Sequence, residues 1–595
     1  MSTFNTGGIL HSLTGSPDEF TTRPVIMGTH GMVTSGHYLA GRIGLHILEQ
    51  GGNAIDAGAA MGFALSVLEP HLYGIGGEVP ILVYLSKERR VKSLSGQGPA
   101  PRAATIEWFR SREIDAIPGD GLTAAVVPAA ADTWIAALSE FGTMSLGEVL
   151  DPAIELAGQG FPMYHRLQAA IQKHADRFRT EWPSSAEVFV PDGKAPEIGE
   201  ILAQTDLART FRKLVEAEHR GLKQGRCSAL QAARDAFYKG EIAESIVAFA
   251  GENEFADASG RRNRGLIELK DLRSYSARIE EPVTAGYRGY DVYKCGPWTQ
   301  GPVFLEQLNL LEGYDLAGLG HNSPDYIHLL AETAKLAFAD RERWYGDPDF
   351  VSVPLDVLLS KTYAAERRAL IDPDHASMEQ RPGNAAPFAP LVQKANPGVN
   401  PGDTTHLDAV DRWGNMLSAT PSGGWFSSSP LVKGLGFPLG TRLQVFCLDP
   451  SHPNALQPGK RPRTTLTPSL VLKDGLPFMV FGTPGGDQQD QWSLQFFLNH
   501  IDFNMNLQAA ADAPNFHTAH FPSSFYPHGA QPGSLMLEGR IPKETRAALE
   551  KKGHHVQVTG DWSNGRLLAI RFDAKSGVMS GAASARMETG YAMGW

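Results

Sequence analysis

The chain has 595 residues, of which 42% are hydrophobic and 20% charged, a composition ordinary for a globular protein with a sizeable core. Its net charge of −11 gives no reason to expect a nucleic acid or an anionic membrane surface as partner. Three scattered cysteines are too few for a disulfide framework, no run of about 18 apolar residues occurs, and residues 1–20 lack the apolar core of a signal peptide, so we expect a soluble, cytoplasmic protein.

The first elements are predicted from apolar spacing and glycines. Apolar residues repeat every four positions over 39–47 and the pattern stops at Gly51-Gly52, so we expect one helix to end there. A second, Ala-rich helix is predicted over 54–68, and the glycines of 74–77 then turn the chain into a strand over 81–85. Such a turn can cradle phosphate, but no strand precedes it, so the dinucleotide-binding interpretation is weak.

The middle of the chain is predicted to be helical and to end in a linker. From 127 to 275 the pattern is mostly helical, with Ser145, Asp151 and Asp235 as candidate helix starts. Residues 376–401 are rich in Pro, Asn and Ala and have no period, which indicates an exposed linker and a sensible place for a chain break.

The last third of the chain is predicted to be rich in strands. A helix over 491–500 lies among these strands, so we expect sheet with covering helices. The predicted hairpins pair 405–410 with 416–420, pair 470–473 with 478–481 around Asp474-Gly475, and occupy 567–580.

The stretch from Gly402 to His406 could hide a nucleophile that exists only after the chain is cut. A threonine at a new N-terminus carries its own general base, because an α-amine with a pKa of roughly 7.7–8.0 is substantially neutral near physiological pH. Thr404 would then supply both the hydroxyl and the base. On this stretch alone, a threonine pair that opens an ordinary edge strand is the commoner explanation.

An ordered series of motifs favours the hidden nucleophile over the ordinary edge strand. Through these motifs the whole chain resembles the gamma-glutamyltranspeptidase family of N-terminal nucleophile hydrolases. Each motif is weak alone, but the series in this order is specific. The motifs are Gly51-Gly52-Asn53-Ala54-Ile55-Asp56-Ala57, Gly74-Ile75-Gly76-Gly77, Phe237-Tyr238-Lys239-Gly240, Asp271-Leu272, Tyr287-Arg288-Gly289-Tyr290, Ala339-Asp340-Arg341, Thr404-Thr405-His406, Pro458-Gly459-Lys460-Arg461-Pro462 and Gly482-Thr483-Pro484-Gly485-Gly486.

The resemblance implies an α+β fold, a four-layer αββα sandwich with extra helices from the N-terminal part. It also implies one precursor that cleaves itself into a large chain, 1–403, which ends in the linker at about 376–403, and a small catalytic chain, 404–595. Both chains would form one body. No cofactor is implied.

The resemblance also assigns roles to five residues. The scissile bond would join Asp403 to Thr404, and Thr404 would be the nucleophile in both self-cleavage and turnover. Ser422 stands where the family places a hydroxyl that orients the new α-amine. Gly485 and Gly486 match the pair whose backbone N–H groups form the oxyanion hole, where each donor is commonly worth roughly 10²–10³ in rate.

The departures fall in the pocket that binds a glutamyl group in true transpeptidases. Gln97 replaces a carboxylate-binding arginine, so a bidentate charged clamp is lost. Arg442 stands where the family has a neutral glutamine and could supply a relocated positive charge for a substrate carboxylate. Thr464 and Thr465 replace two serines, and Gly424 and Val445 replace the asparagine and aspartate that hold the α-ammonium.

These changes indicate that the catalytic machinery is kept while the specificity pocket is rewritten. We expect hydrolysis of a small, carboxylate-bearing amide, with water as acceptor, as in the amidohydrolase and acylase branches of the family. A true gamma-glutamyl transferase that uses glutathione and a non-catalytic binding scaffold are the alternatives. The expected partners are the substrate and the two fragments of the precursor, without nucleic acid or membrane; a homodimer is compatible with these observations.

Other catalytic signals are weak. His517 and His520 have a metal-like spacing but lie in a proline-flanked loop without a clear third ligand, so we expect no metal. Neither Gly-x-Ser-x-Gly nor His-Glu-x-x-His occurs, which removes the usual serine-hydrolase and zinc-protease signals. Trp298 and Trp425 could form walls of a substrate site, although single aromatic residues more often serve packing.

Overall fold

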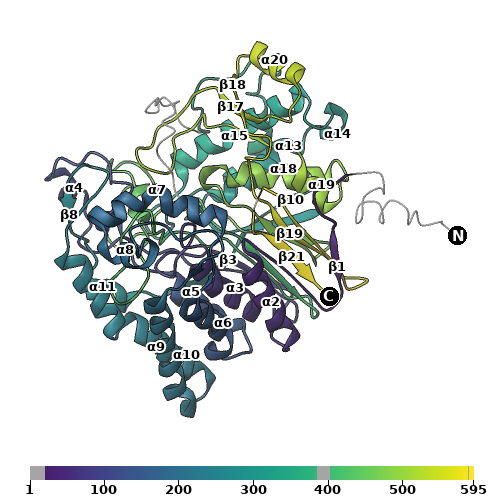
Figure 1. Ribbon diagram of the computed structural model, residues 1–595. Coiled ribbons are helices and arrows are strands. Elements are labelled where there is room, and N and C mark those ends of the chain that lie inside the picture. The colour runs from purple at the N-terminus through teal and green to yellow at the C-terminus, as the bar shows by residue number, and fades with distance from the viewer. Residues whose placement is uncertain (1–19, 385–402, 587) are drawn as a thin grey trace.

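Two antiparallel sheets of seven strands each form the centre of the molecule, and helices cover their outer faces (Figure 1). The computed structural model describes residues 20–384, 403–586 and 588–595. Contacts between the sheets join β2 to β20 and β12 to β19, so the two sheets pack face to face. The layers therefore run helix, sheet, sheet, helix, as expected from the resemblance.

Each sheet contains strands from both sides of residue 404. The first has the order β21 (Tyr591–Gly594), β2 (Gly31–Ser35), β12 (Leu407–Asp411), β13 (Met416–Ala419), β3 (Ile81–Leu85), β4 (Arg90–Ser95) and β9 (Arg278–Glu280). The second has the order β1 (Ile26–Gly28), β20 (Val578–Ala583), β19 (Leu568–Asp573), β15 (Leu476–Gly482), β14 (Ser469–Lys473), β11 (Tyr290–Lys294) and β10 (Val283–Tyr287).

Side chains alternate between the two faces of each strand, as the twofold period of a strand requires. In β12, Leu407 and Ala409 join the core under the helices, whereas Val410 joins the core between the sheets. In β15, Phe481 faces the helices and Val480 faces the other sheet. Both faces of these strands are buried; β15 is apolar throughout, whereas β12 also buries Asp408 and Asp411.

The helices form two outer layers, one on each sheet. Helices α2 (Tyr38–Glu49) and α3 (Ala54–Leu68) pack on the first sheet, and α13 (Pro302–Leu311), α18 (Gln489–Ile501) and α19 (Leu507–Asp512) pack on the second. Further helices surround these layers: α4 (Ile106–Arg110), α5 (Ala130–Phe141), α6 (Leu146–Gln159), α7 (His165–Glu181), α8 (Pro183–Phe189), α9 (Thr205–Gly221), α10 (Arg226–Tyr238), α11 (Glu241–Glu252), α12 (Leu269–Ser274), α14 (Leu316–Leu319), α15 (Pro324–Trp344), α16 (Leu355–Leu358), α17 (Lys361–Arg368) and α20 (Lys543–Lys551).

The start of α3 shows how the sequence fixes an element. The side chain of Asn53 accepts hydrogen bonds from the backbone N–H groups of Ile55 and Asp56, and the Asp56 carboxylate accepts one from the N–H of Asn53. This reciprocal capping satisfies donors that would otherwise be orphaned at the helix start. The predicted helix over 54–68 is confirmed.

Two predicted helix starts are wrong. Ser145 does cap α6, but Asp151 lies inside that helix. The Asp151-Pro152 pair imitates a helix start, because proline favours the first turn, yet α6 continues through it. Asp235 likewise lies inside α10, where its carboxylate pairs with Lys239 four residues later.

The described part of the expected exposed linker, 376–384, is partly packed, although Met378 and Glu379 are exposed as expected. The side chain of Gln380 is buried and donates to the backbone oxygen of His520 over 2.7 Å. The N–H of Gly383 donates to Asp340 over 2.6 Å. The rest of the expected linker, 385–402, lies outside the described residues.

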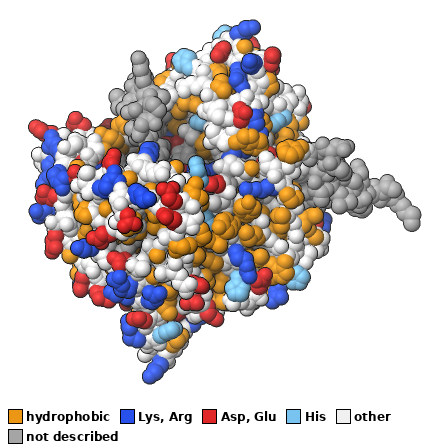
Figure 2. Space-filling view, in the orientation of Figure 1, with side chains coloured by type: hydrophobic (Ala, Val, Ile, Leu, Met, Phe, Trp, Pro, Cys, Tyr) orange, Lys and Arg blue, Asp and Glu red, His pale blue; other side chains and the backbone are white. Residues whose placement is uncertain are grey.

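On the visible face, Lys and Arg side chains are interspersed with Asp and Glu side chains among uncharged atoms (Figure 2). Apolar side chains gather on this face near β21 and α2 (Figure 2), and Met27, Tyr38, Tyr591 and Trp595 are large apolar residues with substantial exposure. Among the described helices, none combines the length and the apolar character needed to cross a membrane.

Candidate active site

The hairpin of β12 and β13 places Thr404 opposite Ser422. Thr404 lies just before β12 and Ser422 just after β13, and the two residues form an isolated antiparallel bridge that extends the hairpin. Both residues are buried. The predicted nucleophile and the predicted orienting hydroxyl are therefore brought together by strand register.

A chain of hydrogen bonds joins the Thr404 hydroxyl to the carbonyl of the residue before it. The Oγ atoms of Thr404 and Ser422 are 3.1 Å apart, and Ser422 Oγ donates to the backbone oxygen of Asp403 over 2.9 Å. Since Ser422 has a single hydroxyl proton, the Thr404 hydroxyl is the donor between the two. The hydroxyl that would attack is thereby linked to the carbonyl that it would attack.

The Asp403 carbonyl also accepts a second donor. The indole Nε1 of Trp425 lies 2.7 Å from this oxygen and 2.8 Å from the backbone oxygen of Leu72. Two donors aimed at one carbonyl oxygen stabilise the negative charge that develops there when a nucleophile attacks. From the sequence, Trp425 is predicted only as a possible wall of the substrate site, because no local pattern reveals the direction of an indole N–H.

Arg442 pairs with a buried acid and contacts Ser422. Its side chain is buried, its Nε atom pairs with the carboxylate of Glu78, and its Nη2 atom donates to Ser422 Oγ over 2.8 Å. Burial raises the pKa of Glu78, and the Arg442 guanidinium opposes that shift. In this structure the guanidinium thus pairs with Glu78 and holds Ser422, while its Nη1 atom has no partner among the described residues, and its role toward a substrate carboxylate stays a prediction.

The predicted oxyanion pair comes from the opposite sheet. Gly485 and Gly486 follow β15 and have φ values of +135° and +58°, a region that favours glycine. A Cβ atom on Gly485 would lie 2.1 Å from the ring of Trp492, so no larger residue fits there. Both glycines line a cavity of about 590 Å³ that Asp403 also lines.

Two arginines in this cavity hold the Asp403 side chain. Arg566 Nη2 pairs with one carboxylate oxygen of Asp403, and Arg166 Nη2 lies 3.3 Å from the other. Burial alone would raise the pKa of the Asp403 carboxyl, but the Arg566 and Arg166 guanidiniums hold it below its usual range. Sequence reasoning missed both arginines, because they lie in segments far from each other and from Thr404.

The other predicted substrate residues lie elsewhere. Gln97 lines a second cavity, of about 670 Å³, together with Arg102 and Arg461. Thr464 and Thr465 are buried, and neither lines either of these cavities. Of the four predicted substrate residues, Arg442 therefore lies beside Ser422, whereas Gln97, Thr464 and Thr465 do not line the cavity of Asp403.

A buried acid lies beside this site. Glu69 is fully buried near Thr405, and burial raises its pKa to about 7, while the neighbouring charges of Arg566 and Arg166 act in the opposite direction. At neutral pH this group is poised between its acid and its carboxylate form.

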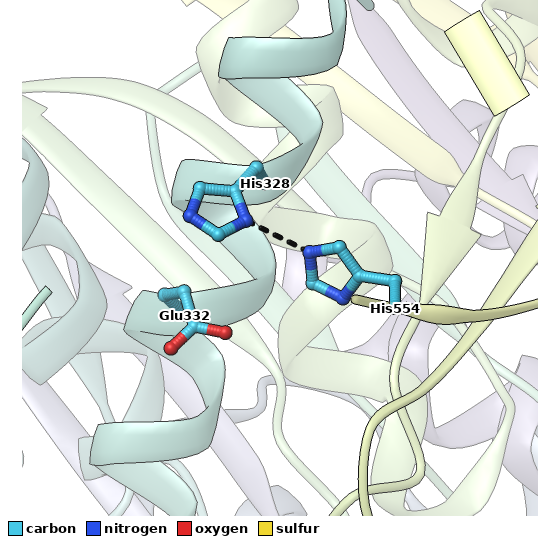
Figure 3. Close-up of side chains that lie close together, drawn as sticks. All are labelled: His328, Glu332 and His554. Carbon is cyan, nitrogen blue, oxygen red and sulfur yellow. Dashed lines mark hydrogen bonds between the residues drawn. The ribbon is translucent and has the colours of Figure 1, made fainter. Parts of the chain in front are cut away.

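A second cluster of titratable groups lies between α15 and the segment before β18 (His555–Thr559). Figure 3 shows the imidazole of His328 directed at His554, with Glu332 one turn along the helix; the two ring nitrogens are 2.8 Å apart. The two oxygens of Glu332 already pair with Lys335 and Arg381. We interpret this cluster as a buried hydrogen-bond network, because two cations occupy the carboxylate that a metal would need.

His517 and His520, the pair with metal-like spacing, have separate contacts. His520 Nε2 lies 3.1 Å from the backbone oxygen of Glu379, and its Nδ1 accepts from the N–H of Gly533. His517 packs its ring edge against Trp492 instead. Neither histidine belongs to a group of three ligand-type side chains within the described residues.

Comparison with known proteins gives a family and close relatives. The family model described as gamma-glutamyltranspeptidase matches residues 40–594. The "Acylase ACY 1 proenzyme" of Pseudomonas sp. (strain SE83) is 36% identical over 572 residues, covering 94% of this chain and 93% of its own length. The "Glutathione hydrolase proenzyme" of Bacillus subtilis (strain 168) is 33% identical over 580 residues, covering 96% and 92%. The solved structure of LmbA2991HD is 46% identical with a TM-score of 0.93, covering 97% of this chain and 100% of that chain.

Proposed function

Because the chain belongs to the gamma-glutamyltranspeptidase family of N-terminal nucleophile hydrolases, we propose that it cuts itself before Thr404 and then hydrolyses a small, carboxylate-bearing amide through an acyl-Thr404 intermediate. The single observation that carries the proposal is the hydrogen-bonded path from the Thr404 hydroxyl through Ser422 to the Asp403 carbonyl.

The first reaction is an N→O acyl shift. Thr404 Oγ1 attacks the carbonyl carbon of Asp403, and Trp425 and Ser422 stabilise the negative charge on the oxygen. The C–N bond breaks as the Thr404 nitrogen takes up a proton, which leaves an ester. Water then hydrolyses this ester, giving a carboxylate on Asp403 and a free α-amine on Thr404.

The second reaction uses the amine that the first releases. The neutral α-amine takes the proton of the Thr404 hydroxyl as the oxygen attacks the substrate amide. Gly485 and Gly486 line the cavity beside Asp403, which supports the proposal that their N–H groups stabilise the tetrahedral intermediate. The amine of the substrate leaves, and water hydrolyses the acyl-threonine.

The alternative is a transferase that uses glutathione, as the name of the Bacillus subtilis relative suggests for that protein. The absence of the usual amine-binding residues at Gly424 and Val445, and the position of Gln97 in the second cavity, favour the acylase-like choice. The acylase relative supports it as well.

A denaturing gel with mass spectrometry tests self-cleavage. The wild type is expected to give two fragments that meet between Asp403 and Thr404, Thr404→Ser should give the same fragments more slowly, and Thr404→Ala should stay intact. A small fragment that begins at another residue, or an active protein that remains intact, would contradict the proposal.

A substrate panel tests the chemistry. Amides of γ-glutamyl, glutaryl and oxalyl groups are compared with the mature protein, with and without an amino-acid acceptor. Glutaryl or oxalyl turnover that does not need an acceptor is expected; glutathione turnover that depends on an acceptor would establish the transferase instead. Thr404→Ala is the blank.

A further inference from the structure

The carboxylate of Asp403 lies in the cavity that the oxyanion glycines line. Its oxygens contact the guanidiniums of Arg566 and Arg166, and one of them also accepts the N–H of Thr404 over 2.9 Å. The residue that would become the new C-terminus after self-cleavage thus places a negative charge beside the proposed nucleophile.

The arginines of this cavity are not equivalent. All three nitrogens of the Arg586 guanidinium have protein partners: Nε and Nη2 lie 2.7 Å from the carboxylate oxygens of Glu538, and Nη1 and Nη2 donate to backbone oxygens. Arg566 is 9% exposed, and its Nη1 atom has no partner among the described residues. For Arg166 and Arg566 alike, the side-chain ion pair found in the described part of the chain is the one with Asp403.

Self-cleavage changes the position of this partner. Once the Asp403–Thr404 bond breaks, Asp403 is no longer held on its C-terminal side, and its carboxylate can leave the cavity. A nearly buried guanidinium without a counter-charge is costly, so the emptied site favours an anion. A planar guanidinium is also the group best suited to a carboxylate, because it offers a fork of parallel N–H donors.

We propose that Arg166 and Arg566 bind the carboxylate of the substrate's acyl group in the mature enzyme, and that Asp403 occupies this site in the precursor as an internal stand-in. This inference rests on the proposed function, which it deepens by locating the carboxylate site.

The covalent structure of Asp403 indicates the length of the acyl group. Two carbons, Cα and Cβ, separate its side-chain carboxylate from the carbonyl that Thr404 attacks. The stand-in therefore points to monoamides of short dicarboxylic acids, of which succinyl and glutaryl groups have two and three intervening carbons. Glu69 is the other acid near Arg566, and its protonated form at lower pH competes less for the guanidinium.

Ligand binding to uncleaved protein tests the stand-in without any catalysis. Glutarate and succinate are titrated by calorimetry into Thr404→Ala and into the double variant Asp403→Ala, Thr404→Ala. The double variant is expected to bind at least about tenfold more tightly, because its site is not occupied, and adding Arg566→Gln should abolish the gain. Equal binding by both proteins, or binding that survives Arg566→Gln, would overturn the proposal.

Asp403→Asn in the Thr404→Ala background guards against misfolding, because it removes the charge and keeps the shape; it should also bind the diacids more tightly than Thr404→Ala alone. Circular dichroism and the melting temperature confirm that each variant is folded.

Kinetics of the mature enzyme give an independent test. Glutaryl and butyryl anilides have similar length, but only the first carries a carboxylate. Arg566→Gln is expected to lower kcat/KM for the glutaryl compound about 30-fold or more while changing the butyryl rate little, since truncation of one member of a buried charge pair costs several kcal/mol. Arg566→Lys should recover part of the loss.

Arg102→Gln is the matched control, because it removes one arginine from the second cavity and should leave the preference for glutaryl unchanged. A loss that is equal for both anilides would contradict the carboxylate site. If Thr404 proves not to be acylated, the proposed function fails, whereas the binding comparison still decides the role of the two arginines.

Discussion

At the scale of single residues, the site joins groups of two kinds. Thr404, Gly485 and Gly486 lie in short motifs that carry a role with them, so they could be predicted from sequence. Trp425 and Arg566 could not, because the direction of an indole N–H and the meeting of distant side chains depend on the packing of two sheets. Resemblance therefore names candidate reacting groups, whereas the side chains that contact them are found only in the folded structure.

Trp425 provides the first prediction at this scale. Trp425→Phe keeps a ring but removes the donor to the Asp403 carbonyl, so self-cleavage should slow about 10²-fold or more. The rate is measured from the loss of the intact band on a denaturing gel. Trp298→Phe is the control, because Trp298 is also buried and its indole nitrogen has no partner within the described residues. Equal rates for both variants would show that the indole donor has no role in cleavage.

Glu69 provides a pH-dependent prediction. Burial raises its pKa from 4.5 to about 7, so between these two pH values the folded protein keeps the group neutral while the unfolded chain ionises it. The stability contributed by this shift is complete below pH 4.5 and is lost as the pH rises through about 7, a change of about 3 kcal/mol. Glu69→Gln stays neutral and should not show this loss.

The measurement is urea unfolding of both proteins at pH 5 and pH 8 in the uncleaved Thr404→Ala background. Between pH 5 and pH 8, the unfolding free energy of the parent should fall more than that of Glu69→Gln. Glu107→Gln, on the exposed surface, is the control. Parallel pH profiles for Glu69→Gln and the parent would disprove the assignment.

At the scale of elements, the hairpins were predictable because each has turn residues between alternating strands. The pairs β12 with β13, β14 with β15 and β19 with β20 are all formed as expected. Helix ends were less certain: Asn53 and Ser145 cap helices, but Asp151 and Asp235 do not. Aspartate occurs both at the N-cap and on the exposed face of a helix, and only the backbone conformation of the residue distinguishes these two positions.

The cap of α3 can be tested directly. Asn53→Ala removes the acceptor for the N–H groups of Ile55 and Asp56 and should lower the free energy of unfolding by about 1 kcal/mol. Chemical denaturation measures the change. Self-cleavage should continue at the wild-type rate, since α3 packs on the outer face of the first sheet; a matching loss of cleavage would contradict this separation.

At the scale of the whole molecule, the four-layer fold followed from the resemblance, but the order of the strands did not. Strand β12 lies between β2 and β13, so a strand from the small chain is inserted next to one from the large chain. Such pairings link residues far apart in sequence, for example Asp408 with Thr34, and no local pattern announces them. The interleaving makes the two halves of the precursor a single body.

This arrangement predicts that cleavage does not separate the fragments. After self-cleavage, 1–403 and 404–595 should elute together in gel filtration under native conditions and separate only in denaturant. Intact mass and light scattering measure the outcome. Dissociation in plain buffer would show that the shared sheets do not hold the fragments together.

The insertion of β12 beside β2 has a consequence for the life of the protein after maturation. An intact chain can unfold and return to the same structure by itself, because all its strands remain tethered. Once the chain is cut, recovery requires two separate molecules to meet and thread their strands into common sheets, so it depends on concentration and competes with aggregation. After cleavage, the lifetime of the active enzyme would therefore depend on its unfolding rate, because the separated fragments would seldom refold together.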